Sequence, residues 1–282
     1  KAGVDVHYSM PGIKVHAKMA IVRRIEDHVP NIYAYMSTGN FHEDTAKIYS
    51  DLGLFTKDKR ITNEVTRLFS YLETQKKPWH SFNHLLVGKF GMKQKLIQKI
   101  RREVKHAKEG KLAKMVLKMN SLQDRTMIEE LYAASQAGVQ ITLIIRGICS
   151  LVPGVKGLSE NINAFSIVDR FLEHARIFIF YNDGDRDIYI SSADWMVRNL
   201  NYRIETIVPI YDEDIRKMIL DLIRIQMNDN VKARLIHHSL NNQYKSDSDD
   251  LAIRSQTETY YYMKRTAELS KESEKEETEE DD

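Results

Sequence analysis

The chain has 282 residues, a formal charge of +2 and 42% hydrophobic residues, a composition typical of a soluble globular protein of about two domains. Its single cysteine, Cys149, excludes an intrachain disulfide and a cysteine-based zinc site. No apolar run reaches the ~18 residues of a membrane span. The small net charge combines two opposite parts, because residues 271–282 carry −6 and residues 1–270 carry +8. The basic part favours a polyanionic partner.

The first half of the chain predicts strands and amphipathic helices in alternation. Residues 2–6 combine an Ala-Gly helix ending with strand-like alternation, so we expect the sequence to be a piece of a longer protein. An apolar strand at 19–22, a turn and a second strand ending at 37–40 follow. Apolar residues at helical spacing then predict helices over 61–72 and 92–104.

The second half repeats this order and ends in a polar segment. We expect strands at 115–119, 141–145, 177–180 and 204–210, helices at 124–135 and 214–227, and a hairpin turn at 182–185. Beyond residue 238 the chain becomes polar, and its Glu-rich end is predicted to be disordered. Trp79 and Trp195 are expected in the core.

One pattern occurs twice. Residues 14–18 place His16 and Lys18 at the start of an apolar strand, and the hairpin that follows ends in a Ser/Thr/Asn cluster. His174 and Arg176 open a second strand whose hairpin ends in a Ser/Asp cluster. Two copies of one βα unit explain this recurrence most simply.

The repeated pattern suits phosphoryl chemistry. Residues i and i+2 of a strand share a face, so each histidine projects with a cation. Two facing copies would bring two imidazoles and several cations to one point. One imidazole can attack phosphorus and the other can act as a general acid or base, while the cations neutralise phosphate oxygens.

Tandem motifs of this kind resemble the phospholipase D superfamily, whose pattern places an aspartate shortly after each His-x-Lys. Here Arg23 and Tyr181 occupy the two aspartate positions, and Arg176 replaces the second lysine. These departures speak against phosphodiester hydrolysis. A phospholipase D-like phosphodiesterase or nuclease stays open as an alternative function, and so does a non-catalytic polyanion-binding fragment.

A narrower resemblance is to the C-terminal half of bacterial polyphosphate kinase, from residue 1 to about residue 230. It implies an α/β fold with two phospholipase D-like repeats packed about a shared cleft. The corresponding division is a first domain at 1–85, truncated at its start, a second at 86–238 and a polar tail at 239–282. The segments that carry the resemblance are IKVHAK (13–18), STGNF (37–41), RITNEV (60–65), RGICSL (146–151), SIVDRFLEH (166–174) and SADWM (192–196).

The resemblance implies a role for each residue of the site. His16 would be phosphorylated by ATP or by polyphosphate and pass the phosphate on, with Lys18 as a phosphate clamp. His174 would contact the nucleotide phosphates or protonate the leaving oxygen. Tyr49 would stack on adenine. The remaining residues expected to bind nucleotide or phosphate, or to orient the histidines, are Asn40, Arg146, Arg176, Asp194 and Arg203.

The family further implies the substrates ATP, ADP and inorganic polyphosphate, and no nucleic acid. Mg²⁺ is expected with ATP, whereas this chain offers no convincing metal ligands, so protein ligands would lie upstream. We expect reversible phosphotransfer through phosphorylated His16, with the fragment incompletely active alone. A homo-oligomeric full-length protein and a cytoplasmic location are expected, and peripheral contact with the inner membrane face is left open.

Overall fold

The computed structural model describes residues 2–8, 11–239, 241–246 and 251–280, the last ten of these without their side chains. The strands are β1 (Lys14–Val15), β2 (Lys18–Glu26), β3 (Val29–Ser37), β4 (Tyr49–Ser50), β5 (Gly53–Thr56), β6 (Leu86–Val87), β7 (Lys114–Met119), β8 (Gln140–Ile145), β9 (Ile162–Ile167), β10 (Leu172–Glu173), β11 (Arg176–Phe180), β12 (Asp187–Ser191), β13 (Arg203–Ile204), β14 (Thr206–Pro209) and β15 (Ala233–Leu235). The helices are α1 (Glu43–Ala46), α2 (Lys59–Thr74), α3 (Met92–Lys108), α4 (Arg125–Gln136), α5 (Val197–Tyr202), α6 (Glu213–Met227) and α7 (Ser255–Glu280), with a 3₁₀ turn at Asn182–Gly184.

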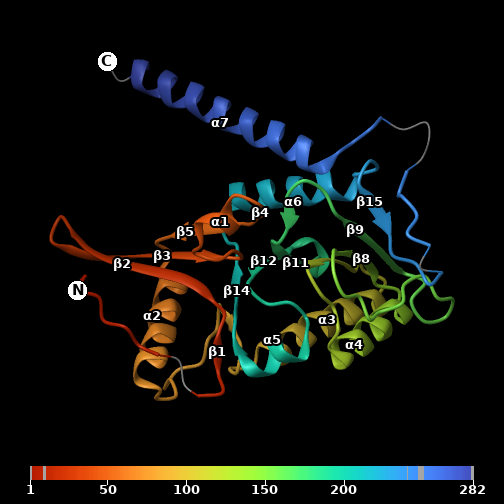
Figure 1. The fold of residues 1–282 in the computed structure, drawn as a ribbon, viewed down its shortest axis with the longest axis horizontal. Coiled ribbons are helices and arrows are strands. Elements are labelled where there is room, and N and C mark those ends of the chain that lie inside the picture. Colours follow the sequence, from red (N-terminus) through yellow and green to blue (C-terminus); the bar gives the residue numbers. More distant parts are fainter. Residues whose placement is uncertain (1, 9–10, 240, 247–250, 281–282) are drawn as a thin grey trace.

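The larger sheet has eight strands in the order β15-β9-β8-β7-β11-β12-β14-β6. Strands β7, β8 and β9 are parallel, and β11 and β12 form an antiparallel hairpin beside β7. Successive side chains of a strand point to opposite faces. Met115 and Leu117 therefore pack with helices α3 and α4, whereas Val116 packs in the cluster that includes α6. Figure 1 shows these helices on the two faces of the sheet.

The smaller sheet has three strands in the order β2-β3-β5 and packs on helix α2. Strands β2 and β3 pair along their whole length, from Lys18 with Ser37 to Glu26 with Val29. Asp27 and His28 join them with φ values of 48° and 64°, the left-handed pair of a tight hairpin turn. Buried residues of both sheets share one hydrophobic cluster, so the two repeats are joined by a common core.

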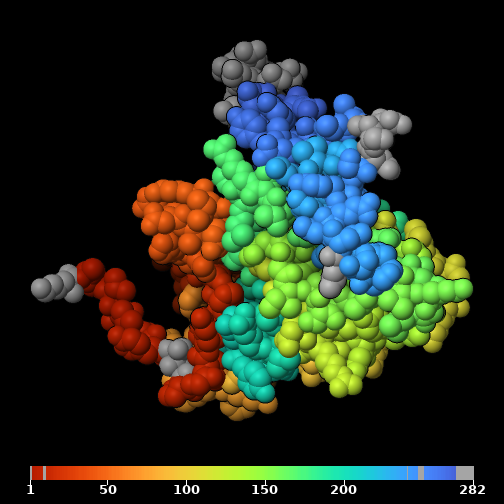
Figure 2. Space-filling model, turned by 45° about the vertical axis from the view of Figure 1, so that its right-hand side comes forward, coloured from red at the N-terminus to blue at the C-terminus, as the bar shows by residue number. Residues whose placement is uncertain are grey.

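Two short strand pairs connect the repeats crosswise. Strand β1 of the first repeat pairs in parallel with β13 of the second, and β10 of the second pairs in parallel with β4 of the first. Each pair ends where a sequence-predicted histidine begins, at His16 after β1 and at His174 after β10. Figure 2 shows the first repeat, red to orange, as a lobe beside the green and cyan second repeat.

The structure corrects three expectations. The strand predicted at 204–210 is two strands, because β13 pairs with β1 and β14 pairs with β12, and the chain changes partner at Glu205. Trp195 is fully buried as expected, but Trp79 is 100% exposed because it lies in the loop between α2 and β6.

The third correction concerns the C-terminal end. The sequence predicted disorder there, whereas the structure gives helix α7, which crosses α6 and extends past the smaller sheet (Figure 1). Glu and Lys are good helix formers, and the Lys264–Glu268 pair at 3.9 Å has the i, i+4 spacing that supports a helix. The prediction for residues 247–250 and 281–282 lies outside the described residues. None of the helices that the structure describes is long and apolar enough to cross a membrane.

Candidate active site

His16 is held by the second repeat through both its backbone and its ring. The backbone N–H groups of His16 and Ala17 donate to the carbonyl of Ile204, at 2.9 and 3.0 Å. The ring Nδ1 lies 2.9 Å from Oε2 of Glu205, and the ring Nε2 lies 3.0 Å from Nζ of Lys18. The strand that positions His16 therefore also delivers its carboxylate partner.

His174 has the same arrangement with the repeats exchanged. The backbone N–H groups of His174 and Ala175 donate to the carbonyl of Ser50, at 3.1 and 2.9 Å. The ring Nδ1 lies 2.7 Å from Oδ1 of Asp51, and Nε2 lies 3.1 Å from Nη1 of Arg176. Each histidine thus contacts a carboxylate from the opposite repeat and a cation from its own.

This pattern fixes the same tautomer for both rings. A carboxylate accepts a hydrogen bond, so Nδ1 carries the proton and Nε2 presents its lone pair to the cation. The His16 side chain is 22% exposed, whereas that of His174 is 10% exposed. The His16 side chain is therefore the more accessible of the two imidazoles.

Hydroxyl groups orient the two carboxylates. Ser192 Oγ donates to Glu205 Oε2 at 2.5 Å, and Asn199 Nδ2 donates to Oε1 at 2.7 Å. Thr38 Oγ1 donates to Asp51 Oδ1 at 2.7 Å. Ser192 and Thr38 lie at equivalent places, each directly after the second strand of its hairpin. The result is a His–carboxylate–hydroxyl group in each half of the site.

Sequence reasoning assigned no role to Asp51 or Glu205. A signal was present, because an acid follows the polar residue at the end of each hairpin, Asn40 or Asp194, by 11 positions. The carboxylates were missed because each acts on the histidine of the other repeat. That pairing depends on the crossed strands β1–β13 and β10–β4.

Lys18 experiences charges from both halves of the site. Burial lowers its pKa from 10.5 to about 8, with Glu205 and Asp51 opposing the shift and Arg176 and Arg203 adding to it. Lys18 is only 6% exposed. The structure therefore brings together side chains that the sequence placed in separate repeats. The size and the positive charge of this centre suit a phosphoryl group as its ligand.

The carboxylate and imidazole of the second half are also perturbed. Burial and the neighbouring Arg176 and Arg146 lower the pKa of His174, despite the opposing hydrogen bond to Asp51. Burial by itself would raise the pKa of Asp51, but the hydrogen bonds from His174 and Thr38 lower it overall. His174 is therefore neutral and Asp51 ionised at neutral pH.

Three of the four further sequence-predicted residues lie beside these groups, and the fourth, Asn40, is exposed at the end of its hairpin. The Tyr49 ring lies 4.9 Å from the His174 ring, centroid to centroid. Arg146 is half-buried at the end of β8, and its Nε donates to the carbonyl of Glu173 at 2.6 Å. Arg203 pairs in register with Lys14 on the crossed strand.

Asp194 lies deeper than these residues. Its Oδ1 accepts from Arg176 Nε at 3.2 Å and from the backbone N–H of Asn120 at 2.8 Å. Asp194 therefore fixes the guanidinium that faces His174. Of the two phospholipase D aspartate positions, Arg23 is exposed on β2 and Tyr181 directly follows β11, so neither supplies a carboxylate.

The carboxylates that the structure describes at this site do not fit a protein-held magnesium ion. Among the described residues, His, Cys, Asp and Glu side chains form no group of three or more that could hold a metal. Asp51 and Glu205, the carboxylates beside the histidines, are already engaged by imidazole and hydroxyl groups.

Comparison with known proteins decides the family. Family models described as polyphosphate kinase C-terminal domain 1 and domain 2 match residues 1–78 and 85–256. The chain belongs to the polyphosphate kinase family. The predicted resemblance is thus confirmed, and the match continues past residue 230, where we expected it to end.

Named polyphosphate kinases support this assignment. The chain is 47% identical over 264 residues to that of Vibrio parahaemolyticus and 44% identical over 264 residues to that of Escherichia coli. Each match covers 94% of this chain and 38% of the relative. The crystal structure of polyphosphate kinase from Porphyromonas gingivalis matches with a TM-score of 0.88 and 47% identity, covering 93% of this chain and 40% of that one. The predicted mixed α/β class is confirmed.

Proposed function

We propose that this chain carries the phosphotransfer centre of a polyphosphate kinase, which transfers the γ-phosphoryl group of ATP reversibly to inorganic polyphosphate through phosphorylated His16. The observation that carries the proposal is the pair of imidazoles with Nδ1 on a carboxylate and Nε2 beside a cation. A nucleophile needs that unprotonated Nε2, and a phosphoryl group needs the adjacent positive charge.

The first step forms one bond to phosphorus and breaks another. Nε2 of His16 bonds to the γ-phosphorus while the bond from that phosphorus to the oxygen bridging the β-phosphate breaks, and ADP leaves. The ring gains positive charge as the N–P bond forms. Glu205, bonded to Nδ1 at 2.9 Å, stabilises that charge.

The second step returns His16 to its starting state. A terminal oxygen of polyphosphate attacks the phosphorus, and the Nε2–P bond breaks. Neutral His174 removes the proton of the attacking oxygen in this direction and returns it in reverse, which agrees with its lowered pKa.

The surrounding residues bind rather than react. We assign Lys18, Arg146, Arg176 and Arg203 to the phosphate oxygens, since all four lie in or beside the centre described above. Tyr49 is assigned to the adenine, because its ring is already packed against that of His174. Asn40, at the end of its hairpin, is assigned to phosphate orientation, and Asp194 orients Arg176.

The remaining assignments belong to the longer protein. Because the chain spans 38% of its relatives' length, we infer that it is incompletely active alone and that the longer polypeptide completes the site. Mg²⁺ enters as the ATP complex in this proposal, with any protein ligands outside this chain. We also propose a homo-oligomeric, cytoplasmic enzyme that uses no nucleic acid.

Activity of the longer polypeptide tests the proposal. Wild-type protein should form polyphosphate from ATP and ATP from ADP plus polyphosphate. His16→Ala should abolish both directions, and His174→Ala should slow both roughly 10²- to 10⁴-fold, as expected for loss of a general acid–base group. Turnover of a chromogenic phosphodiester without polyphosphate synthesis would favour a phospholipase D-like reaction instead. Binding of polyphosphate without any turnover would reduce the protein to a polyanion-binding module.

A further inference from the structure

The segment that leads into His174 is held by residues at the beginning of helix α7, 85 positions later in the chain. Gln256 makes a paired contact with the backbone of Phe171. The Phe171 N–H donates to Gln256 Oε1 at 3.0 Å, and Gln256 Nε2 donates to the Phe171 carbonyl at 2.8 Å. The side-chain amide thus satisfies both backbone groups of Phe171, as a neighbouring strand would.

The same amide reaches the residue before the histidine. Gln256 Nε2 lies 2.8 Å from Oε1 of Glu173, and the other carboxylate oxygen accepts from Lys118 at 2.6 Å and from Gln226 at 3.0 Å. Glu173 is only 5% exposed. A buried carboxylate of this kind is stable only while its partners stay in place, so Gln256 is one of the groups that fix Glu173.

Arg254 holds the start of the segment. Its Nε lies 2.8 Å from Oδ2 of Asp169, and its Nη2 lies 2.5 Å from Oδ1, a two-point contact of the strong planar type. The Asp169 side chain is 2% exposed. Between these two contacts, the backbone N–H of Ser255 donates to the buried carboxylate of Asp229 at 2.7 Å.

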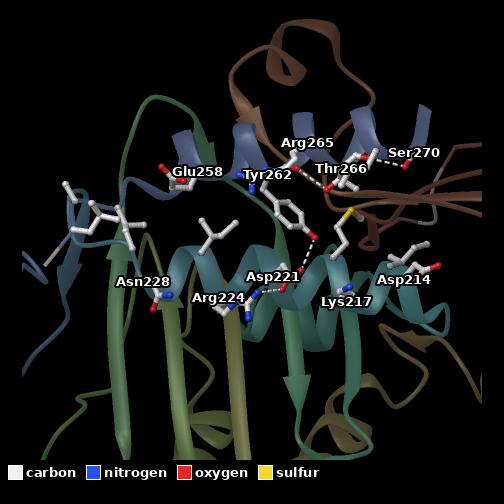
Figure 3. Close-up of a pocket in the computed structure, with 17 residues that line it drawn as sticks. Asp214, Lys217, Asp221, Arg224, Asn228, Glu258, Tyr262, Arg265, Thr266 and Ser270 are labelled. Atoms are coloured by element: carbon white, nitrogen blue, oxygen red, sulfur yellow. Dashed lines mark hydrogen bonds and ion pairs between the residues drawn. The ribbon is translucent and has the colours of Figure 1, made fainter. Parts of the chain in front are cut away.

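The rest of α7 is attached differently. A groove of about 890 Å³ separates it from α6. Figure 3 shows Tyr262 reaching across this groove to Asp221, which also pairs with Arg224. The polar contacts with residues 169–173 are therefore concentrated in the first residues of α7 and in Arg254, directly before it.

We propose that Arg254 and Gln256 are positioning residues for His174, which makes the start of α7 part of the phosphotransfer machinery. The two side chains hold residues 169–173 at both ends, and the next residue is the histidine. Strand β10 in this segment also pairs with β4, which carries Tyr49 and leads into Asp51. Displacing the segment would therefore shift His174 relative to Asp51 and Arg176. This inference rests on the function proposed above.

Four variants and a matched control test the inference. Gln256→Ala removes the paired contact with Phe171, and Gln256→Glu keeps its shape but places a second carboxylate beside Glu173. Arg254→Ala removes the contact with Asp169, and Arg254→Lys keeps the charge. Lys264→Ala is the control, because Lys264 lies on the same helix and is paired with Glu268 rather than with residues 169–173.

Two readouts are needed. Hydrogen exchange of the Phe171 amide should speed up roughly five- to tenfold in Gln256→Ala, as expected for one lost hydrogen bond. In the longer polypeptide, kcat should fall roughly ten- to a hundredfold in both Gln256 variants and in Arg254→Ala, because small misplacements of a catalytic group have effects of this size. KM for ATP should stay within about twofold, Arg254→Lys should recover part of the rate, and the control should match wild type.

The possible results separate the inference from the function on which it rests. A kcat equal to wild type in Gln256→Ala and Arg254→Ala would overturn the positioning role, even if exchange changes. If either alanine variant fails to fold, kcat of Gln256→Glu and of Arg254→Lys is compared with wild type instead, and wild-type values in both would overturn the positioning role. A wild-type protein that forms no phosphohistidine would instead overturn the proposed function, while the Phe171 exchange rate would still report the contact.

Discussion

At the scale of residues, each histidine of the site is prepared for reaction by groups from both repeats. Glu205 and Asp51 hold the proton on Nδ1, and Lys18 and Arg176 face the unprotonated Nε2. The two halves are not equal, because the His16 side chain is about twice as exposed as that of His174. This inequality supports His16 as the nucleophile.

The pKa of Lys18 predicts an alkaline limit for activity. Since this pKa is lowered to about 8, the ammonium that binds phosphate is lost as the pH rises through 8, and the rate should fall there. The stability of the fold should rise over the pH range in which the rate falls. The unfolded chain keeps this proton up to about pH 10.5, so the cost of burying the Lys18 charge is relieved between pH 8 and 10.5 and the free energy of unfolding should rise there. A pH–rate profile with a parallel melting curve checks both trends.

Arginine at this position is the matched variant. Lys18→Arg stays charged throughout this range, so the alkaline fall of its pH–rate profile should move well above pH 8 or disappear. An unchanged alkaline fall in Lys18→Arg would assign the titration to another group.

Removing the charge of either carboxylate should separate the two chemical steps. Glu205→Gln should slow phosphorylation of His16 roughly 10²- to 10⁴-fold, because the ring loses the anion that fixes its tautomer and stabilises its charge. Asp51→Asn should allow labelling of His16 but slow transfer to polyphosphate. Single-turnover experiments with labelled ATP measure the two steps separately. Equal effects of both variants on the labelling step would contradict the division of roles between the histidines.

At the scale of elements, the catalytic geometry comes from strands that change partner. After each hairpin the chain pairs briefly with the other repeat, in β4 or β13, and then returns to its own sheet in β5 or β14. Asp51 and Glu205 lie between these strands. Both carboxylates therefore face the opposite repeat. The backbone N–H of each histidine donates to the carbonyl of the residue just before its carboxylate partner, Ile204 or Ser50.

The sequence predicted the repeated hairpins and the amphipathic helices that the structure shows. It did not predict the carboxylate partners, which lie 189 and 123 positions from their histidines and meet them only through the crossed strands. It also missed α7, because a segment rich in Glu and Lys has the composition of both a solvated helix and a disordered tail. Tertiary contacts at Arg254 and Gln256 decide between the two.

Two truncations test whether the contacts at the beginning of α7 stabilise the fold. A chain that ends at residue 270 keeps every contact of Arg254 and Gln256 and should melt within about 2 °C of the full chain. A chain that ends at residue 253 loses several hydrogen bonds of about 1 kcal/mol each and should melt roughly 5 °C or more lower. Differential scanning calorimetry measures both. Equal melting temperatures would show that these contacts add no stability.

At the scale of the whole molecule, the charge is separated along the chain. Residues 1–270 carry +8 and residues 271–282 carry −6. Such a distribution can steer a long phosphate chain towards the basic part, and its range is limited to about 10 Å at 0.1 M salt. Recognition itself must therefore come from the side chains of the site.

The acidic end is predicted to compete with polyphosphate for the basic part. Deleting residues 271–282 should raise polyphosphate affinity a few-fold at low salt, and the gain should vanish near 0.3 M salt as charges are screened. Replacing the Glu and Asp residues of this segment by their amides keeps its length and should give the same gain. Fluorescence titration with labelled polyphosphate measures the affinity. Unchanged binding at low salt would exclude competition.

The central claim is that a phosphoryl group passes through His16. Brief incubation of the longer polypeptide with γ-labelled ATP and Mg²⁺, followed by alkaline digestion and mass spectrometry, locates the label most directly. We predict one acid-labile phosphate on the peptide containing His16, chased by ADP or polyphosphate, absent in His16→Ala and present in Asp51→Asn. Label of equal yield in His16→Ala, or label on the His174 peptide in wild type, would contradict the account.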